Sequence, residues 1–326
     1  MAMRGGAGSE RATRARRALA SAPLAAAVAA LACAASPQPA PPRATEVATP
    51  FHVIGHRGAA AYAPENTRAG VAAARALGAP AVELDVQRSR DGALVLFHDA
   101  TLDAKTPLRG RVAEHDLAAL LAADIGTWFD ATHPDAPRRH AGEPLAALGD
   151  VLDANGRALA YHLEIKSDDP AIPAELVAAV RARGLADVVT VTSFDRAQLD
   201  RVRAIAPEAP LCWLVRDDGT NLPGASERER RALLADQRAR VDEAAASGFA
   251  QVGLRAGALS REIVDYARVE RGLEVRAWGV RSTADMEHAI AVGANGMTID
   301  WPDRLLARLR ELGVDARAGA LTEDAR

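Results

Sequence analysis

HRGAAAYAPENT at residues 56–67 and ELDVQRSRDGALVLFHDATLD at residues 83–103 are the two segments that decide the fold. In both segments, polar side chains directly follow short apolar runs. His56 follows the run at 51–55, and His98 follows the run at 93–97. Short apolar runs bounded by turn residues predict buried strands. Two histidines, an arginine and several carboxylates gathered at strand ends can bind a metal and a phosphate together.

The run at residues 80–86 predicts a strand that carries two carboxylates on one face. Side chains two residues apart in a strand point to the same side, so Glu83 and Asp85 project together while Leu84 faces a hydrophobic layer. Two carboxylates on one inward face repel each other unless a positive charge lies between them. A divalent cation is the interpretation that we favour.

A hairpin brings His98 back toward these carboxylates. Residues 90–92 end in an Asp-Gly turn, and the apolar run at 93–97 follows directly. Before the hairpin, Asn66 or Thr67 is expected to cap an alanine-rich helix that runs to about Leu77.

Strand-like runs alternate with Ala/Leu/Arg-rich, helix-like segments along the whole chain. The runs fall near residues 51–55, 80–86, 159–166, 188–193, 209–215, 250–254, 273–278 and 296–299. This alternation predicts an α/β fold, a (β/α)8 TIM barrel, although an open doubly wound sheet fits the pattern too. About 280 residues follow the leader, close to the ~250 of one such barrel.

One segment breaks the alternation, at about residues 100–142 after the second strand. It is rich in turn residues and predicts a small insertion over the barrel mouth with one helix, roughly Glu114–Ala123. We expect it to shape the entrance of the substrate, and we expect His133 and His140 to be solvated loop residues.

The first 50 residues differ from the rest. An Arg-rich start, an apolar stretch at 18–32 and a Pro-rich tether at 36–42 predict a signal peptide of about residues 1–32. The apolar stretch is shorter than the ~20 residues of a membrane-spanning helix. Cys33 ends a segment similar to a lipobox, so we expect an exported periplasmic or cell-envelope lipoprotein attached to the membrane through Cys33. Alternatives are a simply cleaved soluble form and an uncleaved anchor.

The expected domains are therefore a leader at 1–50, a barrel at 51–315 and a tail at 316–326. The formal net charge is −3 and no basic block lies outside the leader, which argues against nucleic-acid binding. Lys105 and Lys166 are the only lysines, so a lysine at 166 indicates a specific role. Cys212, in an apolar run, is expected to be a buried, inert thiol. The sequence does not indicate an oligomeric state.

Several short motifs follow one another along the chain in an order that resembles a known family. HRG, PENT, ELDV, the Asp-Gly turn, FHD and TLD are followed by LEIK at 163–166, SFD at 193–195, GLEVRAWGV at 272–280 and IDWPD at 299–303. In this order and spacing they resemble the glycerophosphodiester phosphodiesterase family, over about residues 51–312.

The resemblance implies a metal site and a phosphate site. It assigns metal ligation to Glu83, Asp85 and Glu164, and three carboxylates suit one hard cation, Mg²⁺ or Ca²⁺, better than Zn²⁺. Arg57 and Lys166 would hold the phosphate. The structural alternative is a dry network in which the carboxylates pair only with these two cations.

The resemblance also makes His56 and His98 the general acid and base, without deciding which is which. Glu65 resembles a family position that orients Arg57 or binds a glycerol hydroxyl, and its alternative is a helix-start carboxylate. Trp278 is either an apolar wall for the substrate or a core residue.

The implied function is metal-dependent hydrolysis of a small-molecule glycerophosphodiester to an alcohol and sn-glycerol 3-phosphate. A rival within the fold is a phospholipase D-like enzyme that acts on lysophospholipid or sphingomyelin. A rival of another class is a non-catalytic phosphodiester-binding lipoprotein, which would be expected to lack a histidine or a ligand. None is missing at the matched positions.

Overall fold

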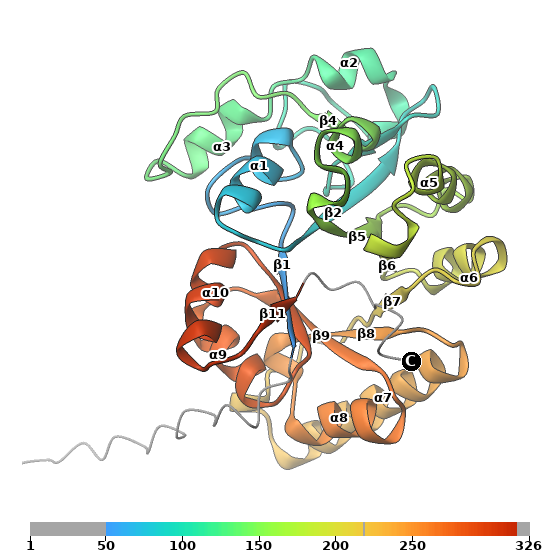
Figure 1. Ribbon diagram of the computed structural model, residues 1–326, viewed down its shortest axis with the longest axis vertical. Helices are drawn as coiled ribbons and strands as arrows, with labels where there is room; N and C mark the ends of the chain where they lie inside the picture. Colours follow the sequence, from blue (N-terminus) through green and yellow to red (C-terminus); the bar gives the residue numbers. More distant parts are fainter. Residues whose placement is uncertain (1–49, 218, 318–326) are drawn as a thin grey trace, which may run out of the picture. The chain divides into compact units, whose positions relative to one another are not determined.

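The computed structural model describes residues 50–217 and 219–317, which belong to one compact unit, Pro41–Arg326 (Figure 1). The predicted signal peptide, the Pro-rich tether and the lipidated Cys33 lie outside the described residues, as does most of the expected tail. Among the described residues, no helix is both long and apolar enough to cross a membrane.

Eight parallel strands within this part of the chain close into a ring. They are β1 (Phe51–Gly55), β2 (Ala81–Arg88), β5 (Ala160–Ile165), β6 (Val189–Ser193), β7 (Leu211–Leu214), β8 (Gln251–Arg255), β9 (Glu274–Val280) and β10 (Gly296–Ile299). Each pairs with the next, and β1 closes the ring by pairing with both β2 and β10. The ring confirms the predicted (β/α)8 barrel and excludes the open sheet.

Helices follow the strands and cover the ring from outside, as Figure 1 shows for α5, α6, α7 and α10. Their bounds are α1 Arg68–Ala76, α4 Leu148–Asn155, α5 Ile172–Arg181, α6 Arg196–Ile205, α7 Glu227–Ala246, α8 Arg261–Asp265, α9 Thr283–Ala291 and α10 Pro302–Glu311. Helix α1 begins as predicted, because the Thr67 side chain accepts a hydrogen bond from the backbone N–H of Gly70.

The strands form because apolar side chains on alternate positions face the helices. Val82, Leu84 and Val86 of β2 are fully buried in the main hydrophobic core. The intervening residues Glu83 and Asp85 are almost as buried, so they must point to the interior of the barrel. Pleating therefore places the acidic pair as predicted.

The chain between β2 and β5, which we call the excursion, begins with the predicted hairpin. Strand β3 (Leu94–Leu96) pairs antiparallel with β2, with Val86 opposite Leu96, and β4 (Ala146–Ala147) extends this edge. A separate hydrophobic cluster holds the excursion together. Its members are Val95, Phe97, Leu102, Val112, Leu120, Ala123, Ile125 and Leu145.

The single helix predicted at 114–123 is wrong in its extent. The chain instead forms a 3-10 turn at Val112–Glu114, helix α2 at Leu117–Leu121 and helix α3 at Gly126–Thr132. His115 and Asp116 adopt extended backbone angles, which separates the turn from α2. Helix α3 is favoured because it buries Phe129 and because Asp124 accepts hydrogen bonds from Thr127.

A last short strand, β11 (Ala316–Arg317), pairs in parallel with β1. It lies just beyond the expected domain boundary at residue 315. The barrel unit therefore continues into the segment that we assigned to the tail.

Candidate active site

A cavity of about 690 Å³ opens at the carboxyl ends of the barrel strands. Residues from all around the ring line it. They include His56, Arg57, Glu65, Glu83, His98, Glu164, Lys166, Phe194, Arg216, Arg276, Trp278 and Asp300. This is the end of a (β/α)8 barrel at which active sites lie.

Three carboxylates gather beneath this cavity. Glu83, Asp85 and Glu164 each offer an oxygen within 4.8 Å of the others, and all three side chains are buried. Strand pairing explains the cluster, because Asp85 of β2 lies opposite Glu164 of β5. Burial raises the pKa values of Glu83 and Glu164, and the negative charge of Asp85 raises both further.

Within the triad, the negative charge of Asp85 is already balanced by neighbouring protein groups. Its carboxylate lies 3.3 Å from Nε of Arg57 and 3.6 Å from Nζ of Lys166, and it accepts a 2.7 Å hydrogen bond from Asn66. Burial disfavours its ionisation, but Arg57 and Lys166 outweigh burial and lower its pKa. At Asp85 the structure therefore contains the ion pairs with Arg57 and Lys166 that a dry network without a metal would also need.

The remaining oxygens fit a cation. Oε1 of Glu83 is buried and has no hydrogen-bond partner among the residues that the structure describes. An unpaired buried carboxylate oxygen is costly, and a bound divalent cation would satisfy it. The triad can therefore hold a metal ion, and its all-oxygen donor set suits a hard cation.

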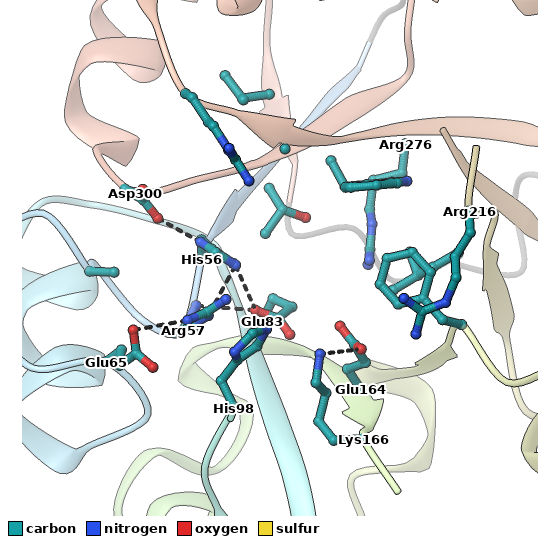
Figure 2. Close-up of a pocket in the computed structure, with 18 of the residues that line it drawn as sticks. His56, Arg57, Glu65, Glu83, His98, Glu164, Lys166, Arg216, Arg276 and Asp300 are labelled. Carbon is teal, nitrogen blue, oxygen red and sulfur yellow. Dashed lines mark hydrogen bonds and ion pairs between the residues drawn. The ribbon is translucent and has the colours of Figure 1, made fainter. Parts of the chain in front are cut away.

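His56 follows β1 directly and has partners on both ring nitrogens. Nδ1 lies 2.6 Å from Oδ1 of Asp300, and Nε2 lies 3.2 Å from Nε of Arg57 and 4.0 Å from Glu83 (Figure 2). Because the guanidinium can only donate, Nε2 accepts and Nδ1 carries the proton that Asp300 accepts.

His98 follows the hairpin and lines the same cavity. Its Nδ1 lies 2.7 Å from Asp99, whose second oxygen lies 2.9 Å from Nζ of Lys105. The hydrogen bond from His98, with help from Lys105, lowers the pKa of Asp99 to about 2 against the effect of burial. Both predicted histidines are therefore present, each with an aspartate on Nδ1.

Arg57 is fixed by carboxylates and by an unusual backbone. Its φ of +50° is in the left-handed region, and its backbone N–H donates to Glu83 at 3.2 Å. The side chain donates to Glu65 at 2.9 Å, the contact expected if Glu65 orients Arg57. Lys105 holds the other oxygen of Glu65 at 2.8 Å. Lys166 donates to Glu164 at 2.8 Å, which places both predicted phosphate-binding cations beside the triad.

Aromatic side chains form another part of the wall. Trp278 is half-buried, lines the cavity and packs edge to face against Phe194, with ring centroids 5.1 Å apart. Its indole N–H donates to the carbonyl of Gly253 at 3.2 Å. Trp278 therefore faces the cavity and is not a core residue.

The other histidines are structural, though not always as expected. His162 is buried beneath the site and bonds to Arg276, while His52 bonds to Glu274. His133 and His140 lie in loops as expected, but each is half-buried and packs its ring against Phe129.

Sequence reasoning missed several residues that complete the site. Asp99, Lys105 and Asp300 orient the predicted residues, and Asn66 holds Asp85. Asp300 follows a strand-like run, so the rule that found His56 could also have found it. Lys105 gave a weaker signal as one of two lysines.

Comparison with known proteins identifies the family. The model of the glycerophosphoryl diester phosphodiesterase family matches residues 56–304. A glycerophosphodiester phosphodiesterase of Bacillus subtilis is 30% identical over 77% of this chain and 83% of its own length. One from Caldanaerobacter subterraneus is 29% identical over 80% of this chain and 98% of its own.

A solved structure agrees in fold and sequence. A candidate glycerophosphoryl diester phosphodiesterase from Silicibacter pomeroyi has a TM-score of 0.69 and 28% identity, over 82% of this chain and 96% of its own. The family match spans every predicted site residue, from His56 to Trp278. The chain therefore belongs to the glycerophosphoryl diester phosphodiesterase family.

Proposed function

We propose that this protein hydrolyses glycerophosphodiesters to an alcohol and sn-glycerol 3-phosphate. The observation that carries the proposal is the meeting of His56, His98 and the acidic triad at one cavity. Relatives support it by name, including the glycerophosphodiester phosphodiesterase of Bacillus subtilis. A phosphodiesterase of Oleispira antarctica, 22% identical and similar in fold, was solved with sn-glycerol-3-phosphate as its product.

Glu83, Asp85 and Glu164 would hold one Mg²⁺ or Ca²⁺ ion. When bound, the ion supplies positive charge that makes the phosphorus atom more electrophilic. Lys166 and Arg57 lie beside the triad and would hold the phosphate oxygens through charge-assisted hydrogen bonds. These two side chains orient the phosphodiester and offset the charge that develops during transfer.

The two histidines divide the proton transfers. Hydrolysis requires removal of a proton from the attacking oxygen and delivery of one to the leaving alkoxide, and a neutral and a protonated imidazole can perform these steps. Asp99 binds Nδ1 of His98, which leaves Nε2 as the nitrogen that can exchange a proton with the substrate. Asp300 likewise binds Nδ1 of His56, whose Nε2 accepts a hydrogen bond from Arg57.

The test is release of sn-glycerol 3-phosphate from a panel of glycerophosphodiesters, with Mg²⁺, with Ca²⁺ and with excess chelator. His56→Gln and His98→Gln should each lower turnover by roughly 10²-fold or more. The double variant should lose much less than the product of both losses, because the residues act in one step. His288→Gln, on α9 outside the cavity, is the matched control.

Three results would refute the proposal. They are full activity in excess chelator, a histidine variant that keeps most of its turnover, and cleavage confined to lysophospholipids or sphingomyelin. The last result would indicate the phospholipase D-like alternative.

We further propose that Cys33 becomes the acylated first residue of an exported form. The apolar run before Cys33 and the Pro-rich tether after it support this proposal. A lipid at Cys33 would keep the barrel at the membrane surface, near phosphodiesters released from lipids.

A further inference from the structure

Arginines line one side of the cavity without a carboxylate partner. Among the described residues, no carboxylate oxygen lies within 4.0 Å of the guanidinium groups of Arg216, Arg276 or Arg281. The other cations at the cavity are paired, Arg57 with Glu65 and Lys166 with Glu164.

Arg276 is the strongest sign that this side of the cavity binds an anion. The residue is 3% exposed, it lines the cavity, and its buried Nε has no partner among the described residues. Its Nη1 bonds at 2.8 Å to Nδ1 of His162, on the strand that lies opposite β9 in the ring. An imidazole ring is either neutral or cationic, so His162 offers Arg276 no counter-charge.

The acidic triad does not remove the need for an anion. Glu83 and Glu164 attract Arg276 from beyond ion-pair distance. A divalent cation at the triad would offset those carboxylates and leave the buried guanidinium uncompensated. An isolated buried charge is costly, so a bound anion would be stabilised there.

Arg216 makes the same side unfavourable for a cationic group. Its guanidinium lies over the Phe194 ring, 4.6 Å from the centroid, and Nζ of Lys166 lies 5.9 Å from that centroid. Phe194 is thus already occupied by protein cations and cannot form the aromatic cage that a quaternary ammonium needs. Arg216 and Arg276 lie across the cavity from Arg57 and Glu65 (Figure 2).

Within the described part of the chain, the carboxylate next to Arg216 is also compensated. Asp217 lines the cavity, but Nε of Arg255 lies 3.0 Å from each of its carboxylate oxygens. Arg216, Arg276 and Arg281 therefore add positive charge to the cavity lining. We refer to these three residues as the arginine wall.

The charge of the scissile group does not account for the arginine wall. A phosphodiester carries a single negative charge, and Arg57 and Lys166 beside the triad are the groups that we propose to bind it. Arg216 and Arg276 lie across the cavity from Arg57 (Figure 2). The cavity, at about 690 Å³, has room for the alcohol part of the substrate beside the phosphate. We propose that the arginine wall is a head-group subsite for glycerophosphodiesters whose alcohol carries a second anionic group, a carboxylate or a phosphomonoester.

The proposal rests on the proposed function and adds a substrate class to it. Planar guanidinium groups bind carboxylate and phosphate oxygens through paired hydrogen bonds, which explains arginine at each position of the wall. Alcohols that carry an ammonium group should be poor substrates, since they would face like charge and an occupied aromatic ring.

A matched set of substrates tests the subsite. Esters of glycerol 3-phosphate with ethylene glycol, ethanolamine and glycolate differ chiefly in a neutral, positive or negative end group. With Mg²⁺ at low salt, kcat/KM for the glycolate ester should exceed that for the ethanolamine ester by ~10-fold or more. The ratio should fall as salt screens the arginines.

Substitutions of the wall arginines test whether these residues cause the preference for the glycolate ester. Arg216→Gln and Arg281→Gln should each lower the glycolate-to-ethylene-glycol ratio of kcat/KM several-fold, and the double variant should bring it close to 1. Arg310→Gln, on the outer helix α10 and not at the cavity, is the control and should leave the ratio unchanged. An equal ratio in the wild type and in both wall variants would overturn the subsite.

Binding separates this proposal from the proposed function. Calorimetry with the Mg²⁺-loaded His98→Gln variant measures affinity for the same three esters without turnover. If no ester is hydrolysed but the glycolate ester binds several-fold tighter through Arg216 and Arg281, the proposed function fails and the subsite stands. If all three are hydrolysed and bind alike, the function stands and the subsite fails.

Discussion

Oδ1 of Asp300 lies 2.6 Å from Nδ1 of His56, the shortest contact that either side chain makes within the described part of the site. Strand pairing produces this relationship. Gly55 at the end of β1 lies opposite Ile299 at the end of β10, so the next residue of each strand stands at the barrel mouth beside the other. Burial disfavours ionisation of Asp300, but its hydrogen bond from His56 lowers its pKa nonetheless.

Replacing Asp300 should therefore reduce turnover more than binding. An aspartate on Nδ1 fixes the tautomer of an imidazole and stabilises its protonated form. Asp300→Asn should lower kcat by at least ~10-fold with a smaller change in KM, and Asp300→Glu should recover part of the loss. Steady-state kinetics on one glycerophosphodiester measures both. A rise in KM alone would mean that Asp300 binds substrate and does not position His56.

Lys105 should contribute to stability because it joins two parts of the site. Its Nζ lies 2.8 Å from Glu65 and 2.9 Å from Asp99, the side chain is 11% exposed, and the ammonium lies 4.9 Å from the centroid of Trp128. Lys105→Met should lower the free energy of unfolding by ~1–3 kcal/mol, since two partly buried carboxylates lose a partner. Urea unfolding measures the difference.

An exposed ion pair provides the comparison for Lys105. Arg109 lies 3.7 Å from Asp103 with 80% of its side chain exposed, so Arg109→Gln should change stability by less than ~1 kcal/mol. Equal effects of the two substitutions would show that the Lys105 bridge contributes no more than a surface pair.

Cys212 should be inert in the folded protein. Burial within β7 raises the pKa of its thiol to about 11. As pH rises from 9 to 11, the unfolded chain loses this proton and the folded chain keeps it, so this thiol's contribution to stability declines in that window. A Cys33→Ser variant should resist iodoacetamide at pH 8 and react fully in urea. Rapid native labelling at pH 8 would contradict the assignment.

The proposed lipid at Cys33 can be read from the mature N-terminus. Mass spectrometry of protein purified from membranes of a bacterial host should find a chain that begins at an acylated Cys33. Cys33→Ser should release the barrel from the membrane fraction. A mature chain that begins after Cys33 and carries no acyl group would indicate a soluble export product.

Strand periodicity was sufficient to predict the barrel and its buried acidic pair. The roles of the site residues came instead from the resemblance of the motifs to a family. Glu83 and Asp85 share a face by pleating, and Glu164 meets them through the neighbouring strand. The second helix of the excursion, α3, was missed although Asp124 at its start accepts hydrogen bonds from Thr127. The contact of Arg276 with His162 spans 114 residues and the barrel interior, so no local pattern reveals it.

The central claim is that the acidic triad, flanked by His56 and His98, binds one catalytic divalent cation. A crystal structure grown with Ca²⁺, with the ion located by anomalous scattering, tests this most directly. We predict a single ion with one oxygen of Glu83, Asp85 and Glu164 each within ~2.0–2.6 Å. An ion bound away from the triad, or a triad that stays closed by Arg57 and Lys166 at saturating Ca²⁺, would contradict the account.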